Sequence, residues 1–164
     1  MSENKETNPF ASQPGTQTRL RAIAESGLVV VVTKAFGPKG ESLVDQEGPQ
    51  FSGYPGVKLL VKQGDVEETV VLSPYFGDPS KEGGTKFVDG KPCELFSPKS
   101  RTPLDKIPGM STEDGGEYYA IYLTSELANG ELVAVNNIWG NTNSRILSED
   151  EVLLLFADAE DGGA

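Results

Sequence analysis

Glycine and proline interrupt this sequence so often that most of it can form only short elements of secondary structure. The 164 residues include 19 glycines and 11 prolines. They are densest between Gly37 and Gly56, where Gly37-Pro38, Gly48-Pro49 and Tyr54-Pro55-Gly56 are combinations typical of turns and loops. We therefore expect a mainly β fold, an antiparallel sandwich or open barrel of about six to eight short strands, with one short helix near each end.

Two pairs of β-rich segments predict hairpins. In the first pair, Val57 to Lys62 and Val66 to Leu72 flank a turn that contains Gly64. In the second pair, Glu117 to Thr124 is followed by Glu131 to Ile138, across a loop that ends in Asn-Gly. Because both faces of the second pair carry apolar residues, we expect it to lie centrally in its sheet.

Two further segments are predicted to be strands. Leu28 to Thr33 is an almost unbroken run of valines, which favours a central strand that is buried on both faces. Pro92 to Ser97 is expected to form a shorter strand. It contains Cys93, the only cysteine of the chain, so no disulfide can form within the chain and nothing indicates an oxidising compartment.

The ends of the chain are predicted to be helical beside the domain and flexible beyond it. Residues 1–15 are polar and should form a flexible tail. Leu20, Ile23 and Ala24 have helical spacing and predict a short helix over 16–26. Ser148 and Glu151 match a capping box and predict a helix over 149–157. Residues 158–164 should form a flexible acidic tail, which leaves 16–157 as a single β-rich domain.

The charge of the chain disfavours two classes of partner. With 25 acidic and 14 basic residues, the net charge of −11 would repel phosphate backbones and anionic lipid surfaces. The apolar runs Leu28 to Val32 and Val152 to Ala157 are also too short to span a bilayer. We therefore expect a cytoplasmic protein that binds neither nucleic acid nor membrane directly, its charge serving solubility or the mimicry of a polyanion.

The sequence lacks the residues that most enzymes use for acid–base and metal chemistry. It has no histidine, which excludes Ser-His-Asp and Cys-His mechanisms within the chain. Gly83-Gly84-Thr85-Lys86 lacks the spacing of a phosphate-binding loop and is interpreted as a turn. Cys93 is expected to be a small buried side chain rather than a nucleophile. We therefore expect no cofactor and no catalytic activity.

One segment resembles a zinc-ribbon knuckle that has lost its metal ligands. Glu94 to Asp105 reads ELFSPKSRTPLD, similar to the pattern F-C-P-x-C-G-x-x-L, with Ser97 and Ser100 where the two cysteines would stand. Serine is a poor zinc ligand because its hydroxyl does not ionise near neutral pH. The resemblance implies a metal-free docking or structural module, and an ordinary turn after a strand is the alternative.

A tryptophan among amide side chains is the first candidate binding site. Trp139, the only tryptophan, lies between Asn137 and Asn141, and Asn143 and Arg145 follow. Tryptophan, asparagine and arginine together are typical of recognition surfaces. The alternative is that Trp139 caps the core while the asparagines form Asx-turns.

A loop after the first predicted hairpin is the second candidate. It contains the adjacent aromatic residues Tyr75 and Phe76 between prolines. One of these rings could join Trp139 in a shared apolar patch, although burial of both in the core would explain them equally well.

Three functions are compatible with these features. The first is a non-catalytic protein-interaction or assembly protein that presents these aromatic loops to another protein, or that self-associates through an edge strand. The second is an acidic inhibitor that mimics nucleic acid, which requires carboxylates in a stripe at phosphate-like spacing. The third is a carbohydrate-binding or carboxylate-catalysed hydrolytic domain, which requires a groove holding Trp139 and two carboxyl groups about 5 to 10 Å apart.

Overall fold

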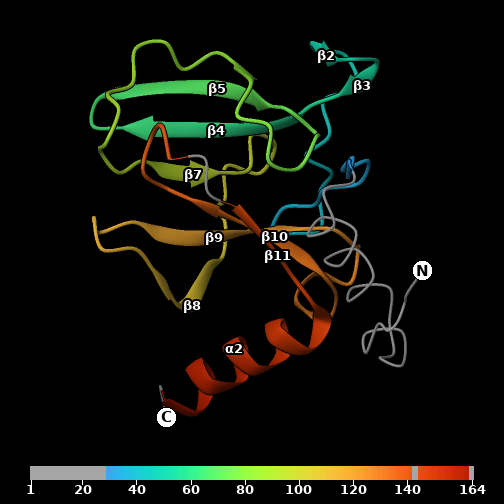
Figure 1. Ribbon diagram of the computed structural model, residues 1–164, viewed down its shortest axis with the longest axis vertical. Coiled ribbons are helices and arrows are strands. Elements are labelled where there is room, and N and C mark those ends of the chain that lie inside the picture. The colour runs from blue at the N-terminus through green and yellow to red at the C-terminus, as the bar shows by residue number, and fades with distance from the viewer. Residues whose placement is uncertain (1–28, 142–143, 163–164) are drawn as a thin grey trace, which may run out of the picture.

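The structure is a computed structural model that describes residues 29–141 and 144–162. Its strands form three antiparallel sheets (Figure 1). The first sheet contains, in spatial order, β11 (Ser144–Leu147), β10 (Leu132–Asn136), β9 (Glu117–Tyr122) and β8 (Lys106–Ser111). The second contains β6 (Lys81–Glu82), β5 (Val66–Leu72), β4 (Val57–Gln63) and β7 (Glu94–Phe96), and the third pairs β2 (Gln50–Phe51) with β3 (Tyr54–Pro55). The prediction of a mainly β chain is confirmed, and no sheet of the described part closes into a barrel.

Both predicted hairpins are present. β4 and β5 pair from Val57 opposite Leu72 to Gln63 opposite Val66, and the turn between them contains Gly64 at a positive φ of 60°, which glycine adopts without steric cost. β9 and β10 also pair antiparallel, and they are the two inner strands of the first sheet, as their apolar faces predicted.

The first sheet buries side chains on both faces. Alternate residues of β9 and β10, such as Ile121 and Val133, belong to a core cluster shared with β4, β5 and β7. The residues that alternate with them, such as Ala120 and Ala134, belong to a second cluster on the opposite face. The two-residue period of a strand produces this division, because successive side chains point to opposite faces. The second sheet therefore adjoins one face of the first.

The helix α2 (Glu149–Gly162) covers the other face of the first sheet (Figure 1). Ser148 caps it as predicted, because its Oγ accepts a hydrogen bond from the Glu151 amide at 3.3 Å while the Glu151 carboxylate accepts one from the Ser148 amide at 3.1 Å. Val152 is fully buried against the second cluster. The helix continues past the predicted end at Ala157, since neither glycine nor proline occurs before Gly162. A short 3-10 helix, η2 (Leu127–Asn129), contacts it.

The predicted central strand from Leu28 to Thr33 is wrong. Within the described residues this segment forms only an isolated bridge between Val31 and Tyr75, and Val29 is 73% exposed. β-Propensity reflects how well a side chain fits a pleated surface and does not fix a place in a sheet. The inner places are taken by β4, β5, β9 and β10, which pair with their neighbours in the chain. The predicted helix over 16–26 and the tail over 1–15 lie outside the described residues.

Candidate functional site

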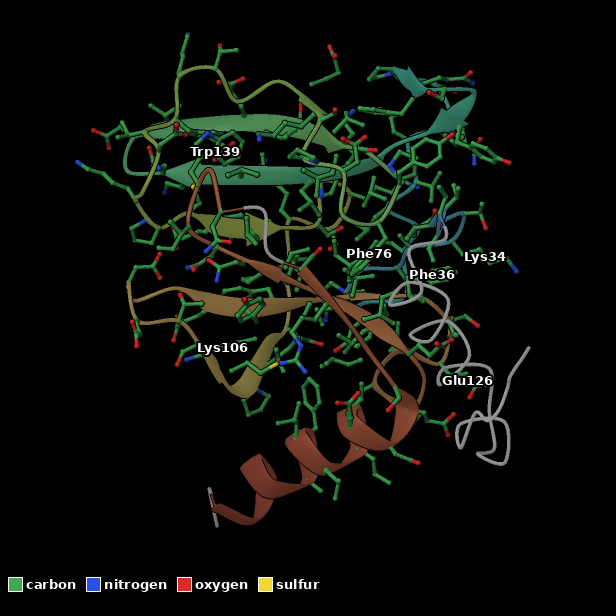
Figure 2. The ribbon with its side chains drawn as sticks, viewed as in Figure 1. Lys34, Phe36, Phe76, Lys106, Glu126 and Trp139 are labelled. Carbon is green, nitrogen blue, oxygen red and sulfur yellow. The ribbon has the colours of Figure 1, made fainter. Side chains whose placement is uncertain are left out.

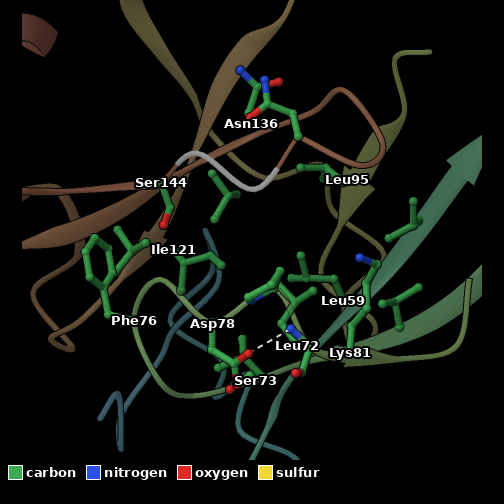
Figure 3. A pocket seen from close by; sticks show the side chains of 18 of the residues that line it. Leu59, Leu72, Ser73, Phe76, Asp78, Lys81, Leu95, Ile121, Asn136 and Ser144 are labelled. Carbon is green, nitrogen blue, oxygen red and sulfur yellow. Dashed lines mark hydrogen bonds between the residues drawn. The ribbon is translucent and has the colours of Figure 1, made fainter. Parts of the chain in front are cut away.

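An apolar pocket of about 170 Å³ is lined by residues of both four-stranded sheets (Figure 3). Its walls are aliphatic side chains that point from β4, β5, β7, β9 and β10 toward the shared core cluster; they include Leu59, Val61, Val70, Leu95, Ile121 and Val133. This pocket is called the two-sheet pocket below. The buried walls are valines, leucines and an isoleucine, and polar residues such as Ser73, Asp78 and Asn136 complete the lining.

Two segments that are far apart in the sequence meet at this pocket. The loop after β5 contributes Tyr75 and Phe76, and the segment after β10 contributes Asn137, Trp139 and Asn141. The structure thus brings most of the predicted site residues to one place. Arg145 lies exposed on β11 and is not among the residues that line the pocket. Asn143 lies outside the described residues.

The sequence left open whether Trp139 is a binding residue or caps the core, and in the structure its side chain is half-buried. Its ring packs edge-on against Phe87, with the centroids 4.8 Å apart, and the ammonium group of Lys81 lies 5.0 Å from the ring centroid. Gly84 allows this arrangement, because a Cβ at that position would lie 2.4 Å from Trp139 Cη2. One part of the ring therefore packs on the protein, while the residue also lines the two-sheet pocket (Figure 2).

The asparagines beside Trp139 hold the backbone in place. Asn137 is buried; its Oδ1 accepts a hydrogen bond from the Glu117 amide at 2.8 Å, and its Nδ2 donates to the Cys93 carbonyl at 3.3 Å. Asn136 Oδ1 accepts a hydrogen bond from the Ile138 amide at 2.9 Å, which is the expected Asx-turn. Asn137 thus ties the Trp139 segment to β9 and to the residue before β7.

Tyr75 and Phe76 differ from each other in their contacts. Phe76 packs against the core cluster, and its amide donates to the Val30 carbonyl at 2.9 Å. Tyr75 meets the ring of Tyr54 edge-on at 6.0 Å, and its hydroxyl donates to the Ser52 carbonyl at 3.2 Å. Both rings are partly exposed. The loop after β5 is therefore anchored at several points and presents its rings from a fixed backbone.

The ionisable groups of the pocket are already engaged by the protein. Asp78 Oδ1 accepts a hydrogen bond from the Ser80 amide at 3.0 Å, and this bond, together with Ser73, lowers the pKa of the Asp78 carboxyl. The Lys81 ammonium lies over the Trp139 ring. Burial raises the pKa of the Cys93 thiol, although Gln63 opposes the effect. Cys93 is buried, as predicted, and its raised pKa disfavours the reactive thiolate.

The knuckle-like segment forms a tight turn after β7. The Ser97 amide donates to the Thr102 carbonyl at 2.9 Å, and the Arg101 amide donates to the Ser97 carbonyl at 2.8 Å. Ser100 Oγ donates to the carboxylate of Glu41. Burial raises the pKa of the Glu41 carboxyl, but hydrogen bonds from Ser100 and other donors outweigh that effect and lower it overall. Ser100 thus contacts a carboxylate from another part of the chain.

The described residues contain no group of three or more histidine, cysteine or acidic side chains that could hold a metal ion. In the same part of the chain, no helix is both long and apolar enough to cross a membrane. Comparisons with protein-family models, curated proteins and solved structures found no match.

Sequence reasoning missed three neighbours of Trp139. Phe87, Gly84 and Lys81 come from segments that carried no recognition signal, and the Gly83-Gly84 pair was interpreted only as a turn. Both glycines do have positive φ values, 94° and 80°. The close approach of the Trp139 ring to Gly84 depends on how two distant loops meet, and no local pattern encodes that.

Proposed function

We propose that this chain is a non-catalytic protein-binding domain. In this proposal its two four-stranded sheets form an open sandwich, and the partner contacts the face where the two-sheet pocket opens. The observation that carries the proposal is the meeting of two distant aromatic segments, one with Tyr75 and Phe76 and the other with Trp139, at a single apolar pocket. Hot spots of protein interfaces combine such aromatic residues with water-excluding pockets.

The chemistry of the pocket supports binding over catalysis. General acid–base or nucleophilic catalysis needs a poised titratable group beside a space for the substrate. The pocket-lining groups of that kind include Asp78, whose carboxyl has a pKa lowered by hydrogen bonds, and Cys93, whose thiol has a pKa raised by burial. Neither is paired with a base or a second carboxylate among the residues that line the pocket.

The carbohydrate alternative has less support. It requires Trp139 beside two carboxyl groups, whereas Asp78 is the one carboxylate among the pocket-lining residues that the structure describes. A sugar also needs several free hydrogen-bonding groups, and Asn137 uses both ends of its amide within the protein.

Selection of peptide ligands tests the proposal. Short random peptides displayed on phage are selected on the wild-type protein, and the enriched peptides are measured by fluorescence anisotropy against wild type and Trp139→Ala. We expect the substitution to weaken binding of the folded protein by about 2 kcal/mol, or roughly thirtyfold in affinity.

The matched control is Leu154→Ala. Leu154 is another large exposed apolar residue, 64% exposed, on α2 beyond the first sheet from the pocket (Figure 1). The Leu154→Ala substitution should leave the affinity for the selected peptides unchanged. If no peptide is enriched, or if the enriched peptides bind Trp139→Ala as tightly as wild type, the proposed function is wrong.

A further inference from the structure

We infer that the partner enters the two-sheet pocket with a single uncharged apolar group about as large as a benzene ring, such as a phenylalanine or leucine side chain. This inference rests on the proposed function and adds to it the chemistry of the anchoring group. Three observations carry it: the volume of the pocket, the exposure of its charged residues, and the burial of its aliphatic walls.

The volume fits one ring. The pocket measures about 170 Å³, and a cavity of about 150 Å³ with leucine, isoleucine and phenylalanine walls is large enough to bind benzene. A single side chain inserted from a partner would fill it.

The two charged residues of the lining, Asp78 and Lys81, are not among its buried walls. Asp78 is exposed and Lys81 is partly exposed, with its ammonium group over the Trp139 ring. Figure 3 shows Asp78 beside Ser73 and Lys81 beside Leu59 and Leu72. A charged group inserted among the valine and leucine walls would lose its hydration without gaining a partner, which is strongly unfavourable.

The aliphatic walls of the pocket are buried. Among the polar residues of the lining, Asn137 makes hydrogen bonds with Glu117 and Cys93. Asn136 Oδ1 accepts a hydrogen bond from the Ile138 amide, while its Nδ2 is buried without a hydrogen-bond partner. Because the buried walls are aliphatic, the pocket selects mainly for apolar area.

The chain contains two built-in reporters of pocket occupancy. Trp139 is its only tryptophan and Cys93 its only cysteine, and both line the two-sheet pocket. A ligand in the pocket should therefore change Trp139 fluorescence and slow the reaction of Cys93 with a small neutral thiol reagent.

Titration with toluene, benzoate and benzylammonium tests the inference. Each of the three probes is a benzene ring with one small substituent, and they differ in charge: toluene is neutral, benzoate negative and benzylammonium positive. We expect toluene to shift the methyl resonances of Leu59, Val61 and Val70 and to protect Cys93. Benzoate and benzylammonium should bind about tenfold more weakly or worse, because their charges lose hydration. The inference is overturned if toluene leaves these resonances unchanged up to its solubility, or if either charged probe binds as well.

Filling the pocket gives a second measurement. Val133→Phe should abolish the toluene shifts, and if that variant does not fold, a benzyl group attached to Cys93 through a mixed disulfide fills the same space. Toluene shifts that persist at the same sites in a filled protein would contradict the inference. If selected peptides depend on Trp139 but toluene does not bind, the inference fails and the proposed function stands. If toluene binds but no selected peptide depends on Trp139, the proposed function fails instead.

Discussion

Replacing Gly84 by alanine should displace the Trp139 ring from its place on the protein. The added Cβ would lie 2.4 Å from Trp139 Cη2, 2.5 Å from Cζ2 and 3.2 Å from Phe87 Cδ2. The two distances to Trp139 are too short for a real contact, and the distance to Phe87 is tight, so the Trp139 ring must move. Gly84 also has a φ of +80°, which costs an alanine about 1 to 2 kcal/mol. With about 1 to 3 kcal/mol for the overpacking, Gly84→Ala should lower the free energy of unfolding by about 2 to 5 kcal/mol.

Gly40 is the matched control for the backbone cost. Its φ of +82° is close to that of Gly84, a Cβ at Gly40 would meet nothing within 4 Å, and its amide donates to the Gly37 carbonyl, away from Trp139. Gly40→Ala should therefore lower the free energy of unfolding only by the backbone cost, about 1 to 2 kcal/mol. The difference between the two variants measures the clash with Trp139.

A double-mutant cycle attributes that difference to the ring. In a Trp139→Ala background the added methyl at Gly84 no longer meets Cη2 or Cζ2, so the excess cost of about 1 to 3 kcal/mol should largely vanish. The measurement is urea denaturation followed by circular dichroism, which does not need the tryptophan. Equal losses for Gly84→Ala and Gly40→Ala, or an excess that survives removal of the ring, would refute the described position of Trp139.

Three further outcomes are expected. Ser148→Ala removes the cap of α2 and should cost about 1 kcal/mol in thermal unfolding; an unchanged midpoint would contradict the capping role. Burial and Asp105 raise the pKa of the Tyr122 hydroxyl above its ordinary value of 10, so stability should fall as the pH rises above about 10, because the unfolded state loses this proton first. Tyr122→Phe also loses the 2.5 Å hydrogen bond to Asp105, so it should be less stable than wild type by about 1.5 to 3 kcal/mol at neutral pH. The variant should also lack the part of the alkaline destabilisation that Tyr122 causes. Urea denaturation midpoints of both proteins, measured from neutral to alkaline pH, check the two expectations. Finally, elemental analysis of the purified protein should find no stoichiometric zinc, since Ser97 and Ser100 stand where a zinc ribbon has thiolates. One tightly held zinc per chain would contradict this expectation.

Features that depend on neighbouring residues were predictable from the sequence. The β4–β5 hairpin needs only two apolar runs and the glycine turn at Gly64. The start of α2 needs only Ser148 and Glu151 three residues apart. In both cases the residues that interact are close in the chain, so a local pattern contains the whole physical cause.

The valine run before Lys34 shows where this reasoning fails. Its composition is that of a central strand, but pairing in a sheet also requires a neighbour on each side. β4 and β5 are joined by a turn at residues 64–65, and β9 and β10 by residues 123–131. Closing such short connections costs little entropy. Val31 meets only Tyr75, in a loop far along the chain. The composition of a segment gives its affinity for a sheet, and the competition among segments decides its place.

The same distinction explains why the site residues could be named but the two-sheet pocket could not. Trp139, Tyr75 and Phe76 were identifiable because aromatic residues beside asparagine, glycine or proline are unusual for a core strand. The pocket walls are ordinary alternating residues such as Leu59 and Val133, which any buried strand would contain. These residues line a pocket only because the two sheets are placed as they are relative to each other. That placement depends on many contacts between segments that are distant in the sequence.

Trp139 finally shows that core residue and binding residue are not exclusive alternatives. Its packing on Phe87 and Gly84 fixes the ring, and a fixed ring loses less conformational entropy when a partner arrives. Its place in the pocket lining leaves part of the residue available for contact. Stability lost in Trp139→Ala and affinity lost in the same variant would then have one physical origin. Gly84→Ala offers a way to separate them, because it keeps the indole and removes only its fixed position. If preorganisation contributes to binding, Gly84→Ala should weaken the affinity of the folded protein for selected peptides while Gly40→Ala does not.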